Sequence, residues 1–259
     1  MENNLLQKPL SDLYRNLHQI VIDERAVSFA SGALTDSPGN NDNRPLLDIY
    51  PPIVDPEYFF TVAGQVAGIL NQHFPGQENE LAQILSAWPK DPERRNELTA
   101  KMFIPGTDLT TCFERELPAE ALGLLFSYTV QLFMRQYVIK ALPFRDLDKW
   151  HKGVCPVCGE KPNLALLDKI NKGKYLHCGY CGVKWRFQRL SCPFCYSYES
   201  QYLFFEGEKK YRIYVCDQCG GYIKTIDCEH AGKEELDLLM EDIKTIHMDL
   251  LALKEGYHK

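Results

Sequence analysis

Four copies of one short motif, C-x-x-C, constrain this chain more than any other feature of its sequence. They take up eight of the ten cysteines: Cys155 and Cys158, Cys178 and Cys181, Cys192 and Cys195, and Cys216 and Cys219. Two residues between a pair of cysteines allow a tight turn that aims both sulfurs at one point, which a tetrahedral metal site requires. The motifs therefore predict small modules that are closed by metal ions.

The spacing of the motifs predicts how they pair. Nineteen residues separate Cys158 from Cys178, and twenty separate Cys195 from Cys216. Both gaps fit the metal-site pattern in which a hairpin of about 15 to 20 residues brings a second knuckle to the first. Only ten residues lie between the second and third motifs, which is short for a hairpin arm. We therefore predict two sites, one formed by Cys155, Cys158, Cys178 and Cys181 and the other by Cys192, Cys195, Cys216 and Cys219.

The segments between the motifs are typical of short strands. Aromatic and β-branched residues are dense in residues 175–177, 183–187, 202–205 and 211–215. Glycines beside the knuckles, such as Gly159, Gly182 and Gly220, tolerate positive φ and let the backbone amides turn toward the sulfurs. The region is therefore expected to form two small antiparallel modules, each closed by one metal.

Two other uses of paired cysteines fit the sequence less well. Structural disulfides need an oxidising compartment, and the first residues lack the basic start and apolar core of a signal peptide. A dithiol redox centre normally has a single C-x-x-C at the start of a helix, whereas this chain has four copies. Whether the metals act only as structural staples or have a reactive role stays open.

The remaining candidate residues do not add up to a catalytic site. Cys112 and Cys228 stand outside every pair and are predicted not to be ligands. His151, His177 and His230 lie near the knuckles, but both quartets are complete without them. We find no Gly-rich phosphate loop, no Ser-His-Asp order and no paired-carboxylate site. The prediction is a protein that is not an enzyme and has no catalytic residues.

The charge distribution argues against a nucleic-acid partner once the metals are counted. Hydrophobic residues make up 45% and charged residues 25% of the chain, as in an ordinary soluble globular protein. Residues 151–230 carry 12 basic and 8 acidic side chains, a net charge of +4. Four thiolates around one divalent ion leave about −2 per site, so two sites cancel this surplus. The electrostatic indication of nucleic-acid binding weakens accordingly.

The rest of the chain is predicted to be helical. Hydrophobic periodicity indicates helices over residues 10–29, 56–73, 79–87, 92–103, 118–141 and 233–254, with a loop over 35–52. Asp55 and Asp91 are expected to cap two of these helices, because each precedes a proline suited to a first turn. The last helix can pack on the metal modules or on the helical domain.

The most apolar helix is expected to form the centre of a helical domain. Its longest uncharged run, residues 121–134, has fourteen residues. A membrane-spanning helix needs about 20. The sequence therefore predicts no membrane span.

Taken together, these features resemble the formate dehydrogenase accessory protein family, FdhE. The resemblance is carried by a helical first part followed by Cys-Pro-Val-Cys-Gly at 155–159, Tyr-Leu-His-Cys at 175–178, Cys181 with Trp185, Cys192 and Cys195, Cys-Asp-Gln-Cys at 216–219, Tyr-Ile-Lys at 222–224 and Glu-Gly-Tyr at 255–257. It is specific over residues 154–225 and architectural over the first 150 residues.

The resemblance implies an α+β architecture. An N-terminal all-helical domain, residues 1–150, is followed by two tandem rubredoxin-like or zinc-ribbon metal modules, residues 151–188 and 189–230, and by a C-terminal helix, residues 231–259, that packs back on the body. It also implies iron bound by the C-x-x-C cysteines. Zinc suits the same tetrahedral thiolate sites, so the expectation is two metal ions, iron or zinc.

The resemblance further implies a cytoplasmic accessory protein or chaperone. It would serve the assembly and maturation of a molybdenum- or tungsten-containing formate dehydrogenase and bind the catalytic subunit of that enzyme. Two other hypotheses remain beside it, a rubredoxin-like electron-transfer protein and a zinc-ribbon protein associated with nucleic acid. The oligomeric state stays open.

Overall fold

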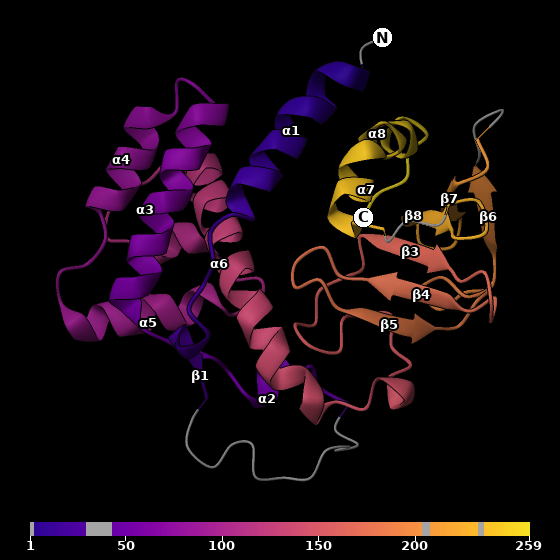
Figure 1. The fold of residues 1–259 in the computed structure, drawn as a ribbon, viewed down its shortest axis with the longest axis horizontal. Helices are drawn as coiled ribbons and strands as arrows, with labels where there is room; N and C mark the ends of the chain where they lie inside the picture. Colours follow the sequence, from indigo (N-terminus) through magenta and orange to yellow (C-terminus); the bar gives the residue numbers. More distant parts are fainter. Residues whose placement is uncertain (1–2, 30–42, 204–207, 233–235) are drawn as a thin grey trace. The chain divides into compact units, whose positions relative to one another are not determined.

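The chain forms two compact units, which we describe separately. A computed structural model describes residues 3–29, 43–203, 208–232 and 236–259. One unit consists of Lys8–Ser37 and Leu47–Pro143 and is mainly helical, whereas the other consists of Met1–Gln7, Pro38–Leu46 and Phe144–Lys259 and contains the larger sheet (Figure 1). The mixed helix and sheet architecture expected from the sequence is confirmed.

Most of the predicted helices are present. The helices of the first 150 residues are α1 (Asn3–Leu17), α2 (Leu46–Ile49), α3 (Pro56–His73), α4 (Glu78–Ser86), α5 (Pro92–Met102) and α6 (Ala119–Ala141). The Asp55 carboxylate accepts a hydrogen bond from the Tyr58 amide at 2.7 Å, and the Asp91 carboxylate accepts one from the Arg94 amide at 2.9 Å. Both predicted caps are thus confirmed.

The prediction of one helix over residues 10–29 is wrong in its second half. Helix α1 ends at Leu17, and a 3-10 turn, Glu24–Ala26, leads into the short strand β1 (Val27–Ser28). Asp23 starts this turn by accepting the Arg25 amide, and β1 pairs antiparallel with β2 (Ile53–Val54). Val27 is fully buried. The apolar residues of this segment thus mark buried positions, but the segment that carries them is not a helix. Residues 35–42 of the predicted loop lie outside the described residues, and α2 interrupts its later part.

Helix α6 supplies the centre of the helical unit, as predicted. The ring of Phe59 in α3 lies 5.3 Å from the Phe133 ring and 6.2 Å from the Phe126 ring, both in α6. All three side chains are buried. Within the described part of the chain, no helix is long and apolar enough to cross a membrane.

The metal-motif region forms one six-stranded sheet. Its strands are β3 (Leu164–Leu167), β4 (Lys174–His177), β5 (Lys184–Phe187), β6 (Ser200–Leu203), β7 (Tyr211–Cys216) and β8 (Tyr222–Asp227), in the order β5-β4-β3-β8-β7-β6. All neighbours are antiparallel except β3 and β8, which pair in parallel with Leu164 opposite Lys224. The antiparallel hairpins were expected, but the parallel pair that joins them was not.

Strands β3 and β8 also escaped the sequence analysis as elements. Strand β3 is a run of four buried residues, Leu-Ala-Leu-Leu, without the aromatic or β-branched residues that indicated the other strands. A strand that is covered on both faces reads as a continuous apolar run rather than an alternating one.

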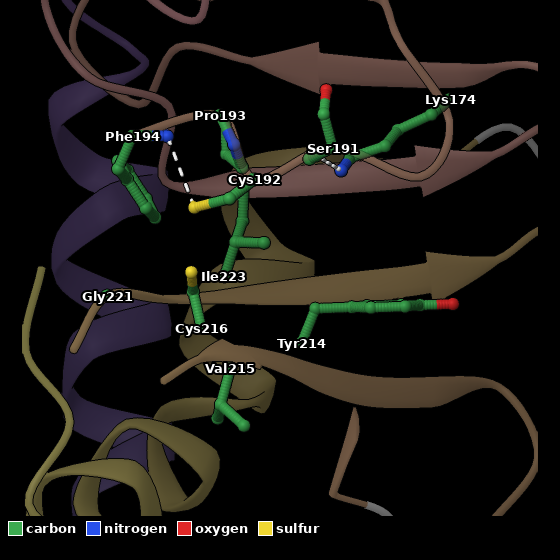
Figure 2. Close-up of a pocket in the computed structure, with 10 residues that line it drawn as sticks. All are labelled: Lys174, Ser191, Cys192, Pro193, Phe194, Tyr214, Val215, Cys216, Gly221 and Ile223. Atoms are coloured by element: carbon green, nitrogen blue, oxygen red, sulfur yellow. Dashed lines mark hydrogen bonds between the residues drawn. The ribbon is translucent and has the colours of Figure 1, made fainter. Parts of the chain in front are cut away.

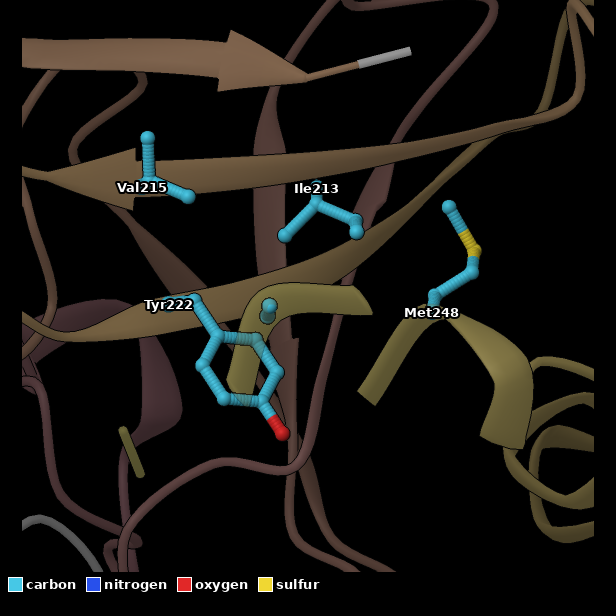
Figure 3. Packing of buried hydrophobic residues seen from close by; sticks show 5 residues of the cluster. Ile213, Val215, Tyr222 and Met248 are labelled. Carbon is cyan, nitrogen blue, oxygen red and sulfur yellow. The ribbon is translucent and has the colours of Figure 1, made fainter. Parts of the chain in front are cut away.

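Two short helices replace the single C-terminal helix that was predicted. Helix α7 (Leu238–Lys244) and helix α8 (Ile246–Lys254) meet at Thr245, whose amide turns back to the Glu241 and Asp242 carbonyls. Residues 233–235 of the predicted helix lie outside the described residues. Met248 and Ala252 pack on Ile213, Val215 and Tyr222 of the sheet, as Figure 3 shows for the labelled residues. The helices therefore cover the metal-motif sheet.

A buried cation fastens these helices to β8. Lys224 is 1% exposed, and its Nζ lies 2.5 Å from the Asp242 carboxylate and 2.6 Å from the Asp249 carboxylate. Burial raises the pKa of Asp249, but Lys224 and Lys259 outweigh it and hold that pKa below its usual value. The hydroxyl of Tyr222 donates to the same Asp249 carboxylate at 2.8 Å. Polar and apolar contacts thus fix the helices on the same face.

Candidate metal centres

The first predicted quartet of cysteines is brought together in the structure, and we call it the first centre. The sulfurs of Cys155, Cys158, Cys178 and Cys181 all lie within 4.8 Å of one another. The Cys155 and Cys181 sulfurs are 3.4 Å apart, as are those of Cys158 and Cys178. All four cysteines are buried.

The second predicted quartet is also brought together, and we call it the second centre. The sulfurs of Cys192 and Cys219 lie 3.8 Å apart, and those of Cys195 and Cys216 lie 3.6 Å apart. Cys192 and Cys216 are buried, whereas Cys195 and Cys219 are partly exposed. The second centre therefore meets solvent along one edge.

The two quartets fit a tetrahedral thiolate-bound metal. Metal–sulfur distances of about 2.3 Å give a tetrahedron whose sulfur–sulfur edges are about 3.8 Å. The sulfur pairs above, at 3.4 to 3.8 Å, come close to this value. All the cysteines are free of disulfides. Four thiolates with no oxygen or nitrogen donor suit zinc or iron. The residues could therefore hold two metal ions, and the donor set does not distinguish zinc from iron.

The backbone turns in the same way at every knuckle. In the first one, the Cys155 amide donates to the Glu160 carbonyl at 2.8 Å, and the Gly159 amide donates back to the Cys155 carbonyl at 3.0 Å. The corresponding two bonds recur around Cys178, Cys192 and Cys216. These turns aim the two sulfurs of each motif at one point without help from a large core.

The turn requires a positive φ four residues after the first cysteine of each motif. Three knuckles use glycine there, with φ of 81° at Gly159, 79° at Gly182 and 67° at Gly220. The third knuckle has Tyr196, with φ of 64°. A side chain in this region costs about 1–2 kcal/mol. The Tyr196 hydroxyl accepts the Gly153 amide at 3.0 Å, which helps offset that cost.

Histidines do not take part in either quartet. His177 precedes the ligand Cys178, but its Nδ1 is hydrogen-bonded to the Asn163 side chain at 3.0 Å. Asn163 in turn donates to the Asp242 carboxylate at 2.9 Å. His177 thus links the first centre's hairpin to helix α7. His151 and His230 lie outside both quartets, as do Cys112 and Cys228.

A buried lysine borders the second centre, and the sequence analysis did not single it out. Lys174 of β4 is 5% exposed, and its Nζ donates to the Ser191 carbonyl at 2.8 Å. Burial lowers the pKa of Lys174 to about 8, and the negative charge of a Cys192 thiolate acts in the opposite direction. Lys174, Cys192 and Cys216 line the same small cavity (Figure 2). Strand β4 belongs to the hairpin of the first centre, so no spacing rule placed this residue near the second.

Residues near position 258 support the fourth knuckle. The His258 amide donates to the Gly220 carbonyl at 2.8 Å, and the His258 carbonyl accepts the Tyr222 amide at 3.1 Å. The Tyr257 hydroxyl donates to the Asp217 carboxylate at 2.9 Å. The second centre therefore depends on a segment that lies far along the chain from its own hairpin.

Comparisons with known proteins agree with the sequence resemblance. Residues 154–189 match the family model described as FdhE, central domain. A protein named FdhE homolog from Aquifex aeolicus is 34% identical over 118 residues, which cover 43% of this chain and 41% of that relative. One from Shewanella sp. (strain MR-4) is 26% identical over 206 residues, covering 75% of this chain and 63% of the relative. The chain spans less than two thirds of both relatives.

A solved structure supports the fold. The crystal structure of the FdhE protein from Pseudomonas aeruginosa matches with a TM-score of 0.53 and 20% identity, covering 78% of this chain and 70% of that one. At this identity the match speaks for the architecture alone. Together with the sequence matches, it confirms the expected resemblance to the FdhE family.

Proposed function

We propose, from the resemblance of this chain to the FdhE family, that it is an accessory protein for the assembly and maturation of a molybdenum- or tungsten-containing formate dehydrogenase. It binds the catalytic subunit of that enzyme, acts in the cytoplasm and catalyses no reaction of its own. The observation that carries the proposal is the match of residues 154–189, which contain the whole first centre, to the FdhE central domain.

Each centre holds one metal ion, iron or zinc, in this proposal. A bound ion supplies the cross-link that joins the two knuckles of a centre. The chain's own contribution is to hold four sulfurs at tetrahedral spacing and to shield them to different degrees. Such metal-closed loops are rigid, and rigid surfaces lose less conformational entropy on binding a partner than flexible ones.

The client surface proposed here is a basic patch on and after strand β5. It consists of Lys184, Arg186 and Arg189, which are all exposed, while Trp185 and Phe187 between them are buried. Charges that project from an edge strand into solvent can attract an acidic surface without disturbing the core.

Capture of the client by a tagged chain tests the proposal. Wild-type protein is expected to retain the catalytic subunit of the host's formate dehydrogenase, and to restore formate dehydrogenase activity in a strain that lacks the chain. Changing Lys184, Arg186 and Arg189 together to Glu should weaken both effects without loss of metal. The matched control changes three exposed basic residues of the helical unit, Lys8, Lys90 and Lys101, to Glu. Normal capture by the β5 variant means that the contact lies elsewhere, and no capture by the wild-type chain refutes the client.

The partial exposure of Cys195 and Cys219 favours one second candidate, a rubredoxin-like electron-transfer protein. Electrons reach a metal most readily where its ligands approach the surface. Visible absorption of the purified protein separates the cases, because zinc tetrathiolate is colourless and ferric tetrathiolate is red. A red colour that dithionite bleaches reversibly supports this candidate, and a colourless protein with full zinc loading excludes it.

A further inference from the structure

One buried charge beside the second centre is not used by the proposed function. Lys174 lies at the start of β4, within the hairpin that joins the two knuckles of the first centre. Its side chain nevertheless reaches the residue that precedes Cys192, because Nζ donates to the Ser191 carbonyl at 2.8 Å. Figure 2 shows this side chain extending from its strand toward Ser191 and Cys192.

In the part of the chain that the structure describes, no carboxylate forms an ion pair with Lys174. Its other close neighbours are two rings, with Nζ 5.5 Å from the Phe187 ring centre and 6.0 Å from that of Tyr214. Burial lowers the pKa of Lys174 to about 8, and the negative charge of a Cys192 thiolate acts in the opposite direction. A buried ammonium without an opposite charge is strongly destabilising.

A small cavity beside Lys174 is shared with two cysteines of the second centre. Its lining includes Lys174, Ser191, Cys192 and Cys216, and its volume is about 10 Å³. This is the space of about one water molecule. The ammonium of Lys174 and the cysteines of the second centre therefore border the same space.

We propose that Lys174 is a positioning residue of the second centre, whose ammonium balances the negative charge of the four thiolates and their metal and holds the Ser191 carbonyl in place. The inference rests on the metal binding proposed above. Four thiolates and one divalent ion carry about −2, and a nearby cation stabilises this charge more strongly in a buried site than in water. The hairpin of the first centre thus completes the second centre, which depends on the first module.

Metal release from the intact chain tests the role of Lys174. The full-length protein is loaded with zinc, mixed with an excess of chelator and treated with an alkylating reagent during release. Mass spectrometry of the alkylated peptides then reports which quartet has opened. We expect Lys174→Met to release zinc from the second centre about tenfold faster than wild type, as expected for loss of a hydrogen bond to a charged group. The first centre should release zinc at the wild-type rate.

Two further variants separate charge from packing. Lys174→Arg keeps the positive charge and should retain zinc better than Lys174→Met. Lys169→Met removes an exposed lysine from the same hairpin and should behave as wild type. If iron is loaded instead, Lys174→Met should lower the midpoint potential of the second centre, because the cation favours the more negative, reduced state.

Three results would overturn the inference. One is an unchanged rate of zinc release from the second centre of Lys174→Met. Another is equal loss from Lys174→Arg and Lys174→Met, which would make packing rather than charge the cause. The third is faster release from both centres, which would mean a general weakening of the sheet. None of these readouts involves the client, so failure of the proposed function leaves the test intact.

Discussion

The two centres are built from the same parts but meet solvent differently. Each uses two C-x-x-C knuckles with the same pair of backbone hydrogen bonds, and each brings four sulfurs within 4.8 Å of one another. All four cysteines of the first centre are buried, whereas Cys195 and Cys219 of the second are partly exposed. Identical ligands can thus be placed in environments that suit a structural cross-link and an accessible site.

The difference arises from what surrounds the knuckles. The first centre is covered locally, for example by Leu46 at the start of α2, whose amide donates to the Pro156 carbonyl at 3.0 Å. The second centre borders the strand at the sheet edge, β6, and takes support from Lys174, Tyr257 and His258. We therefore expect the first centre to hold the fold and the second to respond to its environment.

Removal of ligands should give the largest contrast. Changing Cys155 and Cys158 to Ser should unfold the sheet unit, because a small module without its metal lacks a sufficient core. Changing Cys192 and Cys195 to Ser should remove one metal and leave the β3–β4–β5 part folded. Metal analysis and hydrogen exchange of the sheet peptides measure both outcomes. Changing the unpaired Cys112 and Cys228 to Ser is the control, and full metal loading of either paired variant would contradict the ligand assignment.

Chelation should separate the centres in time. The partly exposed sulfurs of the second centre can be reached through local opening, whereas the first centre opens only when more of the sheet does. We expect the second centre to lose its metal first, by about tenfold in rate, which corresponds to a difference of about 1.4 kcal/mol in activation free energy. Alkylation of the released thiols identifies the centre. Complete chelation should leave the circular dichroism of the helical unit largely intact, and a single step for both metals would erase the distinction.

The contact of Tyr257 with the fourth knuckle should stabilise the second centre only. Tyr257→Ala removes a hydroxyl that donates to Asp217 and a ring that packs on the sheet core. A lost hydrogen bond costs about 0.5–1.5 kcal/mol, so the second centre is expected to release its metal faster. The release rate of the first centre should not change. Tyr257→Phe keeps the ring and should show a smaller effect in the same release assay. Equal acceleration at both centres would show that the segment supports the whole sheet.

The smallest expected effects concern the turns themselves. At Gly182, where φ is 79°, an added Cβ would meet no atom within 4 Å. Gly182→Ala should therefore lower the free energy of unfolding by about 1–2 kcal/mol, through backbone strain alone. Tyr196→Phe removes the hydroxyl that accepts the Gly153 amide and should cost about 0.5–1.5 kcal/mol, toward the lower end because the ring is half exposed. Denaturant unfolding of the metal-loaded protein measures both. A larger loss of stability in Tyr196→Phe than in Gly182→Ala would contradict this prediction.

The sequence by itself determined the local features of this protein. The C-x-x-C spacing indicated which cysteines group together, because a turn of fixed length and a hairpin of limited length can close only with certain partners. Asp55 and Asp91 marked helix starts, since a cap acts within three residues. The same local view failed over residues 18–29, where buried positions with near-helical spacing belong to a turn and a strand.

Only the tertiary structure decided how the two metal modules are joined. The parallel pairing of β3 with β8 links Leu164 to Lys224, sixty residues further along the chain, and nothing in either segment specifies the other. The same pairing forms the sheet in which Lys174 reaches Ser191. In that sheet one quartet is buried and the other is partly exposed. Ligand identity depends on spacing within a few turns of chain, whereas exposure and charge balance depend on which distant segments pack together.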